Sequence, residues 1–179
     1  MKISTKQLVY AAMAIALATV CSFIKLSHLP FGGSVTLFSM LFVTLAGYWF
    51  GPAVGIVSAV AYGILQFVLD PYFYSIPQMI IDYPVSFGAL GLAGFFSNKK
   101  YGLQIGYVVG VLGRYIGACV TGYIFFGSYA NFQTFFGKVA YSTTYNATYI
   151  LPEMIATLVV ISLPPVKNVF KMIKEKAQQ

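Results

Sequence analysis

Residues 76–96 read IPQMIIDYPVSFGALGLAGFF and place one carboxylate, Asp82, in a run that is otherwise almost wholly apolar or small. The run has about the 20 residues that an α-helix needs to cross a bilayer. A charged side chain is costly inside a membrane, so its presence there is a functional hypothesis by default. We therefore expect a transmembrane helix over 77–96 and a special role for Asp82.

The composition of the whole chain is that of a membrane protein. Of its 179 residues, 59% are hydrophobic and 8% are charged, against about 25% charged in ordinary soluble domains. This length leaves room for about six spans with short loops and no separate soluble domain. We predict an all-α integral membrane protein in which residues 1–179 form a single domain, a bundle of six transmembrane helices.

Turn residues divide the apolar runs from one another. Segments such as KLSHLPFGG, FGP, DPYFYSIP and LPPVKN carry the Pro, Gly and polar residues that end helices. The first run has no convincing cleavage site after it, so it is expected to be a span and not a signal peptide. The expected helices cover 5–24, 34–50, 52–69, 77–96, 103–128 and 147–163, with an irregular start allowed at GGSVT in the second.

The lysines predict how the bundle faces the membrane. The net charge is +7, but the basic residues lie in flanks and loops, so no nucleic-acid partner is expected. With six spans both termini share one side, and the other side holds only Lys25 and Lys138. The termini side holds Lys2, Lys6, Lys99, Lys100, Lys167, Lys171, Lys174 and Lys176. Because short basic loops stay inside, both termini are expected to be cytoplasmic.

Two more ionisable residues, Arg114 and Glu153, fall within expected spans. Counted along their helices, both lie roughly 16 to 18 Å deep. They can therefore meet, and an ion pair is the plain structural interpretation. Asp82 differs, because it lies only roughly 7 to 8 Å from the outer end of its helix.

Aromatic and amide side chains accompany Asp82 in the outer half. Tyr72 and Tyr83 are near it in sequence, and Tyr141 and Asn146 lie at the outer start of the last expected helix. A carboxylate, an amide and aromatic faces at one depth suit a flat cationic ligand. An Asp82 that only fixes helix packing is the alternative. Interfacial tyrosine belts are common, but they need neither Asp82 nor Asn146.

Small residues recur along the first helix, in AAMAIALATV. Ala12 and Ala16 are four residues apart, and Ala14 and Ala18 repeat that spacing on a neighbouring face. Such stripes let another helix approach closely. Packing within the bundle is the ordinary interpretation, and a docking face for a separate subunit is the other.

The chain has no obvious energy source or cofactor site of its own. It lacks GxxxxGK[ST], so it does not hydrolyse ATP by a P-loop mechanism. Cys21 and Cys119 lie in apolar runs without CxxC spacing, so neither a metal nor a disulfide is expected. A binding bundle that takes its energy from a partner fits this pattern.

Several motifs resemble the thiamine-specific S components of energy-coupling factor (ECF) vitamin transporters, the ThiT or YuaJ family. They are KLSHLPFGGSVTL, IIDYPVSFGALGLAG, GRYIGACVTGYIFFGSYA and AYSTTYNATYILPEM. The most specific parts are DYP and YNATYILPE, because apolar periodicity would not dictate either.

The resemblance implies six helices, no enzymatic activity, and a high-affinity thiamine site near the outer face of a bacterial plasma membrane. It also implies a transmembrane coupling subunit (EcfT) and two cytoplasmic ATPases as partners, with Ala12, Ala14, Ala16 and Ala18 as the docking face. The implied ligand site is made of Asp82, Tyr72, Tyr83, Arg114, Phe126, Tyr141 and Asn146.

The chain departs from the family pattern at the expected site. Ala118 stands where a histidine is expected, Phe126 replaces a tryptophan of some relatives, and Asp82 replaces a glutamate. A related ligand, such as hydroxymethylpyrimidine or pyridoxine, is therefore the alternative to thiamine. His28 would substitute for the missing ring only if its loop covers the site.

Two other classes of function stay open on the residues alone. In a membrane enzyme, Asp82 or Glu153 would act as a general base, but the chain shows no metal cluster and no nucleophile–base pair. A carrier or channel working alone would need no ATPase partner.

Overall fold

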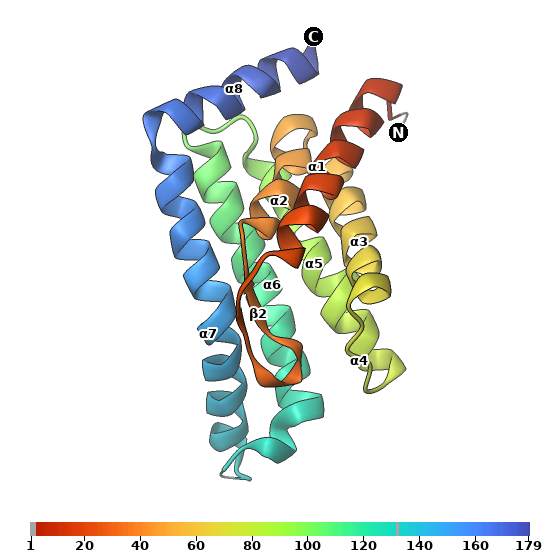
Figure 1. The fold of residues 1–179 in the computed structure, drawn as a ribbon, viewed down its shortest axis with the longest axis vertical. Coiled ribbons are helices and arrows are strands. Elements are labelled where there is room, and N and C mark those ends of the chain that lie inside the picture. Colours follow the sequence, from red (N-terminus) through yellow and green to blue (C-terminus); the bar gives the residue numbers. More distant parts are fainter. Residues whose placement is uncertain (1–2, 132) are drawn as a thin grey trace.

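The computed structural model describes residues 3–131 and 133–179, which form a helical bundle with one further helix lying across its end (Figure 1). Lys2, one of the lysines counted above, lies outside the described residues. Within the described part, five helical segments are long and apolar enough to cross a membrane. They are α1 (Thr5–Phe23), α3 (Pro52–Leu69), Ile76–Phe96, Gly102–Tyr129 and α7 (Phe135–Ser162).

A hairpin replaces the start of the predicted second helix. Residues 34–36 form β2 (Ser34–Thr36), which pairs antiparallel with β1 (Lys25–His28) across η1 (Pro30–Gly32). Helix α2 (Ser39–Phe50) has 12 residues, or about 18 Å, which is less than the roughly 30 Å of a hydrocarbon core. The predicted helix over 34–50 is therefore wrong before Ser39.

The turn from the hairpin into α2 has an unusual backbone. Phe38 is the N-cap of α2 and adopts a left-handed conformation with φ 61°. Such a conformation in a large residue is held only where the surroundings determine it strongly. The surroundings of Phe38 include the Glu153 carboxylate of α7, which accepts hydrogen bonds from residues on both sides of Phe38 and is described with the site.

The segment Ile76–Phe96 has the predicted extent but an irregular interior. It consists of α4 (Ile76–Ile80), a π-helical turn η2 (Ile81–Val85), α5 (Ser86–Gly88) and the 3₁₀ helix η3 (Ala89–Phe96). Pro84 lacks an N–H and breaks the regular ladder. The Ser86 N–H bonds to the Ile81 carbonyl five residues earlier, and the Ser86 hydroxyl also donates to that carbonyl, at 2.7 Å. The irregular turn carries Asp82.

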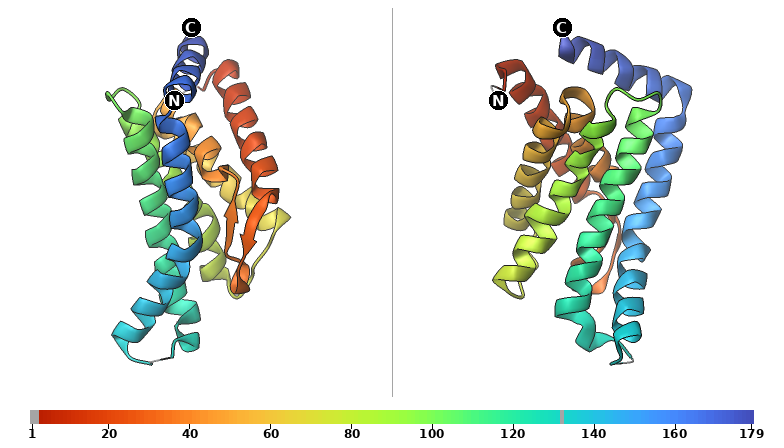
Figure 2. Two further views of the ribbon diagram at one scale, coloured as in Figure 1. Left: turned by 60° about the vertical axis from the view of Figure 1, so that its left-hand side comes forward. Right: turned by 180° about the vertical axis from the view of Figure 1, so that it is seen from behind.

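This segment packs between α3 and α6 (Gly102–Phe126), as Figure 2 shows from behind. The approach of α3 is close. A Cβ atom on Gly63 would lie 2.4 Å from the Tyr83 carbonyl oxygen. Glycine at position 63 therefore lets α3 press against η2 and fixes the depth of the irregular turn.

The last long helix begins earlier than predicted. It starts at Phe135 and not near 147, because the Thr134 hydroxyl accepts from the Gly137 N–H at 3.1 Å and caps it. The chain reaches it from α6 through η4 (Gly127–Tyr129). Tyr141 and Asn146 consequently lie inside α7, on a rigid element.

A helix that the sequence analysis did not predict, α8 (Pro164–Gln178), crosses the end of the bundle that carries both termini (Figure 1). Lys174 donates to the Ser97 carbonyl, and burial lowers the pKa of this lysine. Lys6 donates to the Lys176 carbonyl at 2.7 Å. The first helix, the loop after η3 and the C-terminal helix thus meet at one end.

Candidate functional site

A cavity of about 160 Å³ lies in the half of the bundle away from the termini. The hairpin, the loop 70–75, the irregular turn η2, α6 and α7 all contribute to its wall. The seven residues expected at a ligand site all line it: Asp82, Tyr72, Tyr83, Arg114, Phe126, Tyr141 and Asn146. The fold brings these residues together, and their contact with a ligand stays a prediction.

The Asp82 carboxylate is held by a neutral partner. Its Oδ2 accepts from the Gln78 Nε2 at 2.7 Å, one helical turn earlier. The other carboxylate of the cavity wall, Asp70, is instead paired with the Lys25 ammonium at 2.5 Å. The hydrogen-bond partner of Asp82 therefore supplies no positive charge to offset the negative charge of an ionised carboxylate.

Tyrosines form the wall beside Asp82. The Tyr83 hydroxyl accepts from the Tyr72 N–H at 2.7 Å and donates to the Asp70 carbonyl at 3.2 Å. This fixes the loop 70–75, and the Tyr72 ring lies with its centroid 5.7 Å from that of Phe126. Burial raises the pKa of the Tyr72 hydroxyl, which keeps it neutral. The result is an aromatic surface next to the carboxylate.

Arg114 and Glu153 do not form the ion pair considered above. Among the described residues no ion pair joins them, and the Glu153 carboxylate accepts four hydrogen bonds from three other residues. The donors are the Thr36 N–H and hydroxyl, at 3.1 and 2.7 Å, the Ser39 hydroxyl at 3.3 Å and the Met40 N–H at 3.1 Å. Glu153 thus caps the N-terminus of α2, where the helix dipole favours a negative charge.

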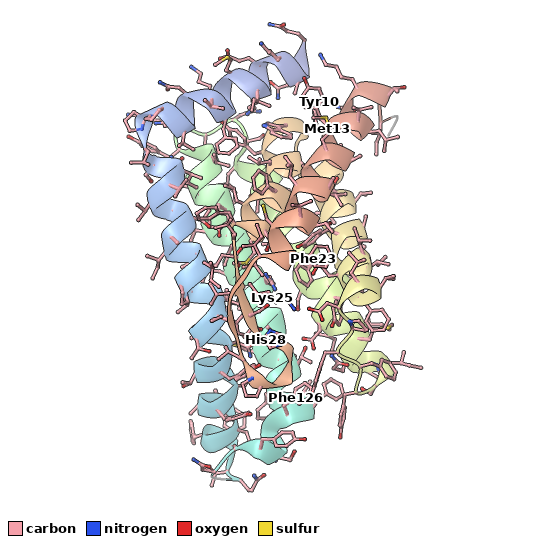
Figure 3. The ribbon with its side chains drawn as sticks, viewed as in Figure 1. Tyr10, Met13, Phe23, Lys25, His28 and Phe126 are labelled. Atoms are coloured by element: carbon pink, nitrogen blue, oxygen red, sulfur yellow. The ribbon has the colours of Figure 1, made fainter. Side chains whose placement is uncertain are left out.

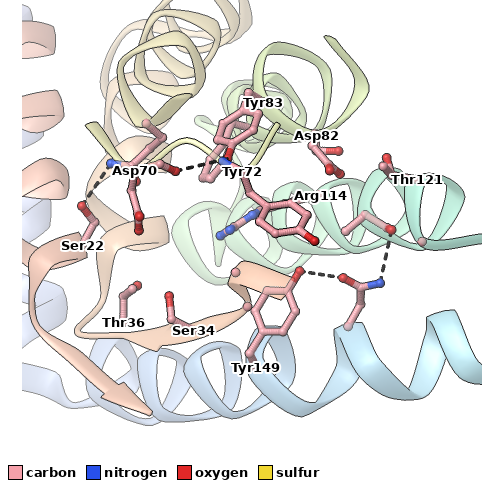
Figure 4. A pocket seen from close by; sticks show the side chains of 18 of the residues that line it. Ser22, Ser34, Thr36, Asp70, Tyr72, Asp82, Tyr83, Arg114, Thr121 and Tyr149 are labelled. Atoms are coloured by element: carbon pink, nitrogen blue, oxygen red, sulfur yellow. Dashed lines mark hydrogen bonds between the residues drawn. The ribbon is translucent and has the colours of Figure 1, made fainter. Parts of the chain in front are cut away.

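Arg114 projects into the cavity. Its guanidinium carbon lies 4.1 Å from the centroid of the Phe87 ring. Figure 4 shows the Arg114 side chain between Asp82 on one side and Thr36 on the other. The arginine is therefore a wall residue of the cavity, held by cation–π contact.

Asn146 is tied into the bundle more fully than expected. Its Nδ2 donates to the carbonyls of Ala118 and Ser142, at 3.2 and 2.9 Å, and its Oδ1 accepts from the Tyr149 hydroxyl at 2.6 Å. Asn146 thereby joins α6 to α7 and orients Tyr149 at the cavity (Figure 4). In this geometry the Asn146 amide is bonded to other protein groups and is not free to reach a ligand.

The hairpin covers one side of the cavity. The Gly33 N–H donates to the Tyr145 hydroxyl at 3.1 Å, and that hydroxyl donates to the Pro30 carbonyl. Lys25 reaches from the hairpin to Asp70, but His28 is exposed and is not among the lining residues (Figure 3). In this conformation His28 does not take the place of the ring missing at Ala118.

Comparison with known proteins places the chain in a family. The family model described as "Thiamine transporter protein (Thia_YuaJ)" matches residues 8–173. The chain belongs to this family. The thiamine transporter ThiT of Bacillus subtilis (strain 168) is 34% identical over 149 residues, which cover 75% of this chain and 76% of that relative. The Thia_YuaJ family is a transporter family and not an enzyme family, as the motifs indicated.

Solved structures show the same fold as this Thia_YuaJ member. ThiT from Listeria monocytogenes has a TM-score of 0.70 at 21% identity, with 92% of this chain and 96% of that chain covered. The S-component for biotin from an ECF-type ABC transporter has a TM-score of 0.58 at 17% identity, with 99% and 96% covered. The overall fold is thus shared with the Listeria ThiT and with an S component.

The alanines of α1 in this Thia_YuaJ member divide into two sets. Ala14 and Ala18 are 1% and 0% exposed, whereas Ala12 and Ala16 are exposed. The expectation that all four form a docking face is corrected, because Ala14 and Ala18 pack inside the bundle. Of these four alanines, only Ala12 and Ala16 are left on a face that a separate subunit can contact.

Sequence reasoning missed several residues of the cavity. Ser86 and Thr121 line the wall, and Gln78, which is not a lining residue, holds Asp82 by a hydrogen bond. A buried glutamine one turn before Asp82 was a detectable signal, since amides are rare in an apolar run. The position of Thr121 depends on how α6 is rotated, which no local pattern reports.

Proposed function

We propose that the chain is the thiamine-binding S component of an ECF transporter and that the cavity is its high-affinity thiamine site. The observation that supports this proposal is that Asp82 and several aromatic side chains line one cavity in a member of the thiamine transporter family. Asp82 balances the positive charge of the ligand or accepts from its aminopyrimidine group. Tyr72, Phe126 and Tyr141 stack on its rings.

In this proposal the cavity opens toward the outside of a bacterial plasma membrane. The hairpin and α2 together make the second of six crossings, and the termini are cytoplasmic, in agreement with the lysines gathered at their end. Energy comes from two cytoplasmic ATPases through the transmembrane coupling subunit, which docks on the face of α1 that exposes Ala12 and Ala16.

Calorimetry on the purified chain tests the ligand. Thiamine is titrated beside hydroxymethylpyrimidine and pyridoxine, with Asp82→Asn as the variant and Glu175→Gln, on α8, as the matched control. We expect tight thiamine binding that weakens at least about a hundredfold in Asp82→Asn, as when a buried charge pair loses one partner. The control should bind as the unaltered chain does.

The other outcomes of this titration are equally informative. Binding of a comparator in place of thiamine reassigns the ligand, and Ala118 in the cavity wall is the feature that favours this second candidate. Binding of none of the three compounds refutes the proposed site.

A transport assay tests the partnership. Ala12→Trp and Ala16→Trp should keep thiamine binding but abolish ATP-driven uptake into vesicles that contain the coupling subunit and ATPases. Ala156→Trp, at an exposed alanine of α7, is the control and should transport normally. Uptake by the chain without partners would contradict the S-component mechanism.

A further inference from the structure

Gln78 is a fully buried amide beside the candidate site. It lies in α4, is 0% exposed, and was not among the residues expected at the site. Burying a glutamine side chain is unfavourable unless its amide is hydrogen-bonded. The amide of Gln78 meets this condition completely, with partners in two different parts of the cavity wall.

The first partner is the Asp82 carboxylate, to which the Gln78 Nε2 donates at 2.7 Å. The other two belong to the loop 70–75. The same nitrogen donates to the Tyr72 carbonyl at 3.2 Å, and the Gln78 Oε1 accepts from the Tyr74 N–H at 3.0 Å. One side chain therefore connects the carboxylate of the site to the loop that bears Tyr72.

We infer that Gln78 is a positioning residue, which aims the Asp82 carboxylate at the ligand and holds the Tyr72 loop in register with it. This inference rests on the proposed thiamine site. The chemistry of the partner matters, because an amide orients one carboxylate oxygen without supplying a positive charge. A lysine or arginine at position 78 would neutralise Asp82 and compete with a cationic ligand.

Packing alone does not account for a glutamine at this place. An apolar side chain can fill a buried space without needing any hydrogen-bond partner, whereas a buried amide is tolerated only where its hydrogen bonds are made. Methionine has nearly the length of glutamine and would fill the same space. Gln78→Met therefore removes the hydrogen bonds of the amide while it keeps most of the contact with the helix and loop.

A double-mutant cycle on thiamine binding tests whether Gln78 acts through Asp82. The dissociation constant is measured for the unaltered chain, Gln78→Met, Asp82→Asn and the double variant. We expect Gln78→Met to weaken binding at least about tenfold, and by a smaller factor in the Asp82→Asn background, where only its effect through the Tyr72 loop remains. Unaltered binding in Gln78→Met, or two effects that multiply, would overturn the inference.

Hydrogen exchange in the ligand-free protein tests the connection to the loop independently of thiamine. The Tyr74 amide should exchange at least about tenfold faster in Gln78→Met than in the unaltered chain. Gln104→Met is the matched control, since Gln104 bonds to the Ile161 carbonyl and does not line the cavity. Equal exchange at Tyr74 in all three proteins would overturn the inference.

The two readouts separate this inference from the proposed function. If the unaltered chain fails to bind thiamine, the proposed function fails, and Tyr74 exchange alone decides whether Gln78 positions the loop. If Gln78→Met does not fold, Gln78→Glu replaces it and is measured at a pH where both carboxylates are ionised, because an ionised carboxylate at position 78 still accepts from Tyr74 but cannot donate to Asp82. That variant should keep Tyr74 protected and bind thiamine weakly, and normal binding would overturn the inference.

Discussion

Two segments close the cavity, and they are held in different ways. The hairpin 25–36 is tied at its base by the buried Glu153 carboxylate and nearer its tip by Tyr145. The loop 70–75 is tied by the neutral groups Gln78 and Tyr83, and at its start by the exposed ion pair of Asp70 with Lys25 of the hairpin. Hydrogen bonds to a charged acceptor are roughly twice as strong as neutral ones. We therefore expect the base of the hairpin to belong to the stable part of the fold, and its tip and the loop to be displaced more easily.

The largest expected effect tests the base of the hairpin. In Glu153→Gln the new amide nitrogen replaces either the oxygen that accepts from Thr36 or the oxygen that accepts from Ser39 and Met40, so at least one buried N–H is left without an acceptor. We expect a loss of about 3 kcal/mol in the free energy of unfolding, measured by thermal unfolding in detergent. Glu175→Gln, on exposed α8, is the control, and an unfolding temperature of Glu153→Gln equal to that of the control would show that the charge does not hold the hairpin.

Two glycines allow the packing of two cavity walls, η2 and the hairpin, to be compared. A Cβ on Gly63 meets the Tyr83 backbone at 2.4 Å, whereas one on Gly33 meets the end of the Tyr145 side chain at 2.7 Å. Because a side chain can move aside more easily than a backbone, Gly63→Ala should cost about 2 kcal/mol of stability and Gly33→Ala less.

Thermal unfolding of the two alanine variants in parallel checks this order. Thiamine titration adds a second readout, because Gly33→Ala should displace the hairpin tip and weaken binding even where stability is nearly unchanged. The reverse order of stabilities would mean that the hairpin, and not η2, is the more tightly packed wall.

The smallest expected effect concerns the tip of the hairpin. Tyr145→Phe removes a hydroxyl that bonds to both Gly33 and Pro30. The loss should be about 1 kcal/mol, with faster hydrogen exchange at the Gly33 amide. Tyr123→Phe, on α6 against Phe135, provides the control. Unchanged exchange at Gly33 would place the tip among the rigid parts of the molecule.

The outcome for Glu153 shows how far sequence reasoning reaches. Counting along helices placed Arg114 and Glu153 at similar depths, but depth says nothing about rotation around a helix axis. Glu153 turns toward the N-terminus of α2, and Arg114 turns into the cavity. The mistaken pair and the mistaken start of the second helix have one cause. The hairpin strand folds back inside the bundle, so backbone N–H groups at Thr36 and at the start of α2 are free to donate to Glu153. These donors were not expected while residues 34–50 were predicted to form one helix.

The alanines of α1 show the same limit. Their spacing indicated small-residue faces correctly, but four alanines on two neighbouring faces do not say which face the bundle uses. Ala14 and Ala18 face α2 and α3, so only Ala12 and Ala16 remain available to a partner.

The sequence by itself determined the membrane class, the extents of four of the six expected helices and seven of the residues that line the cavity. It did so because polar and aromatic side chains stand out against apolar runs, and because the motifs DYP and YNATYILPE are specific to a family. Only the tertiary structure decided the partners of Glu153, Asn146 and Gln78. Those partners depend on how helices rotate and on where the hairpin inserts, and both are set by close packing between segments far apart in the chain.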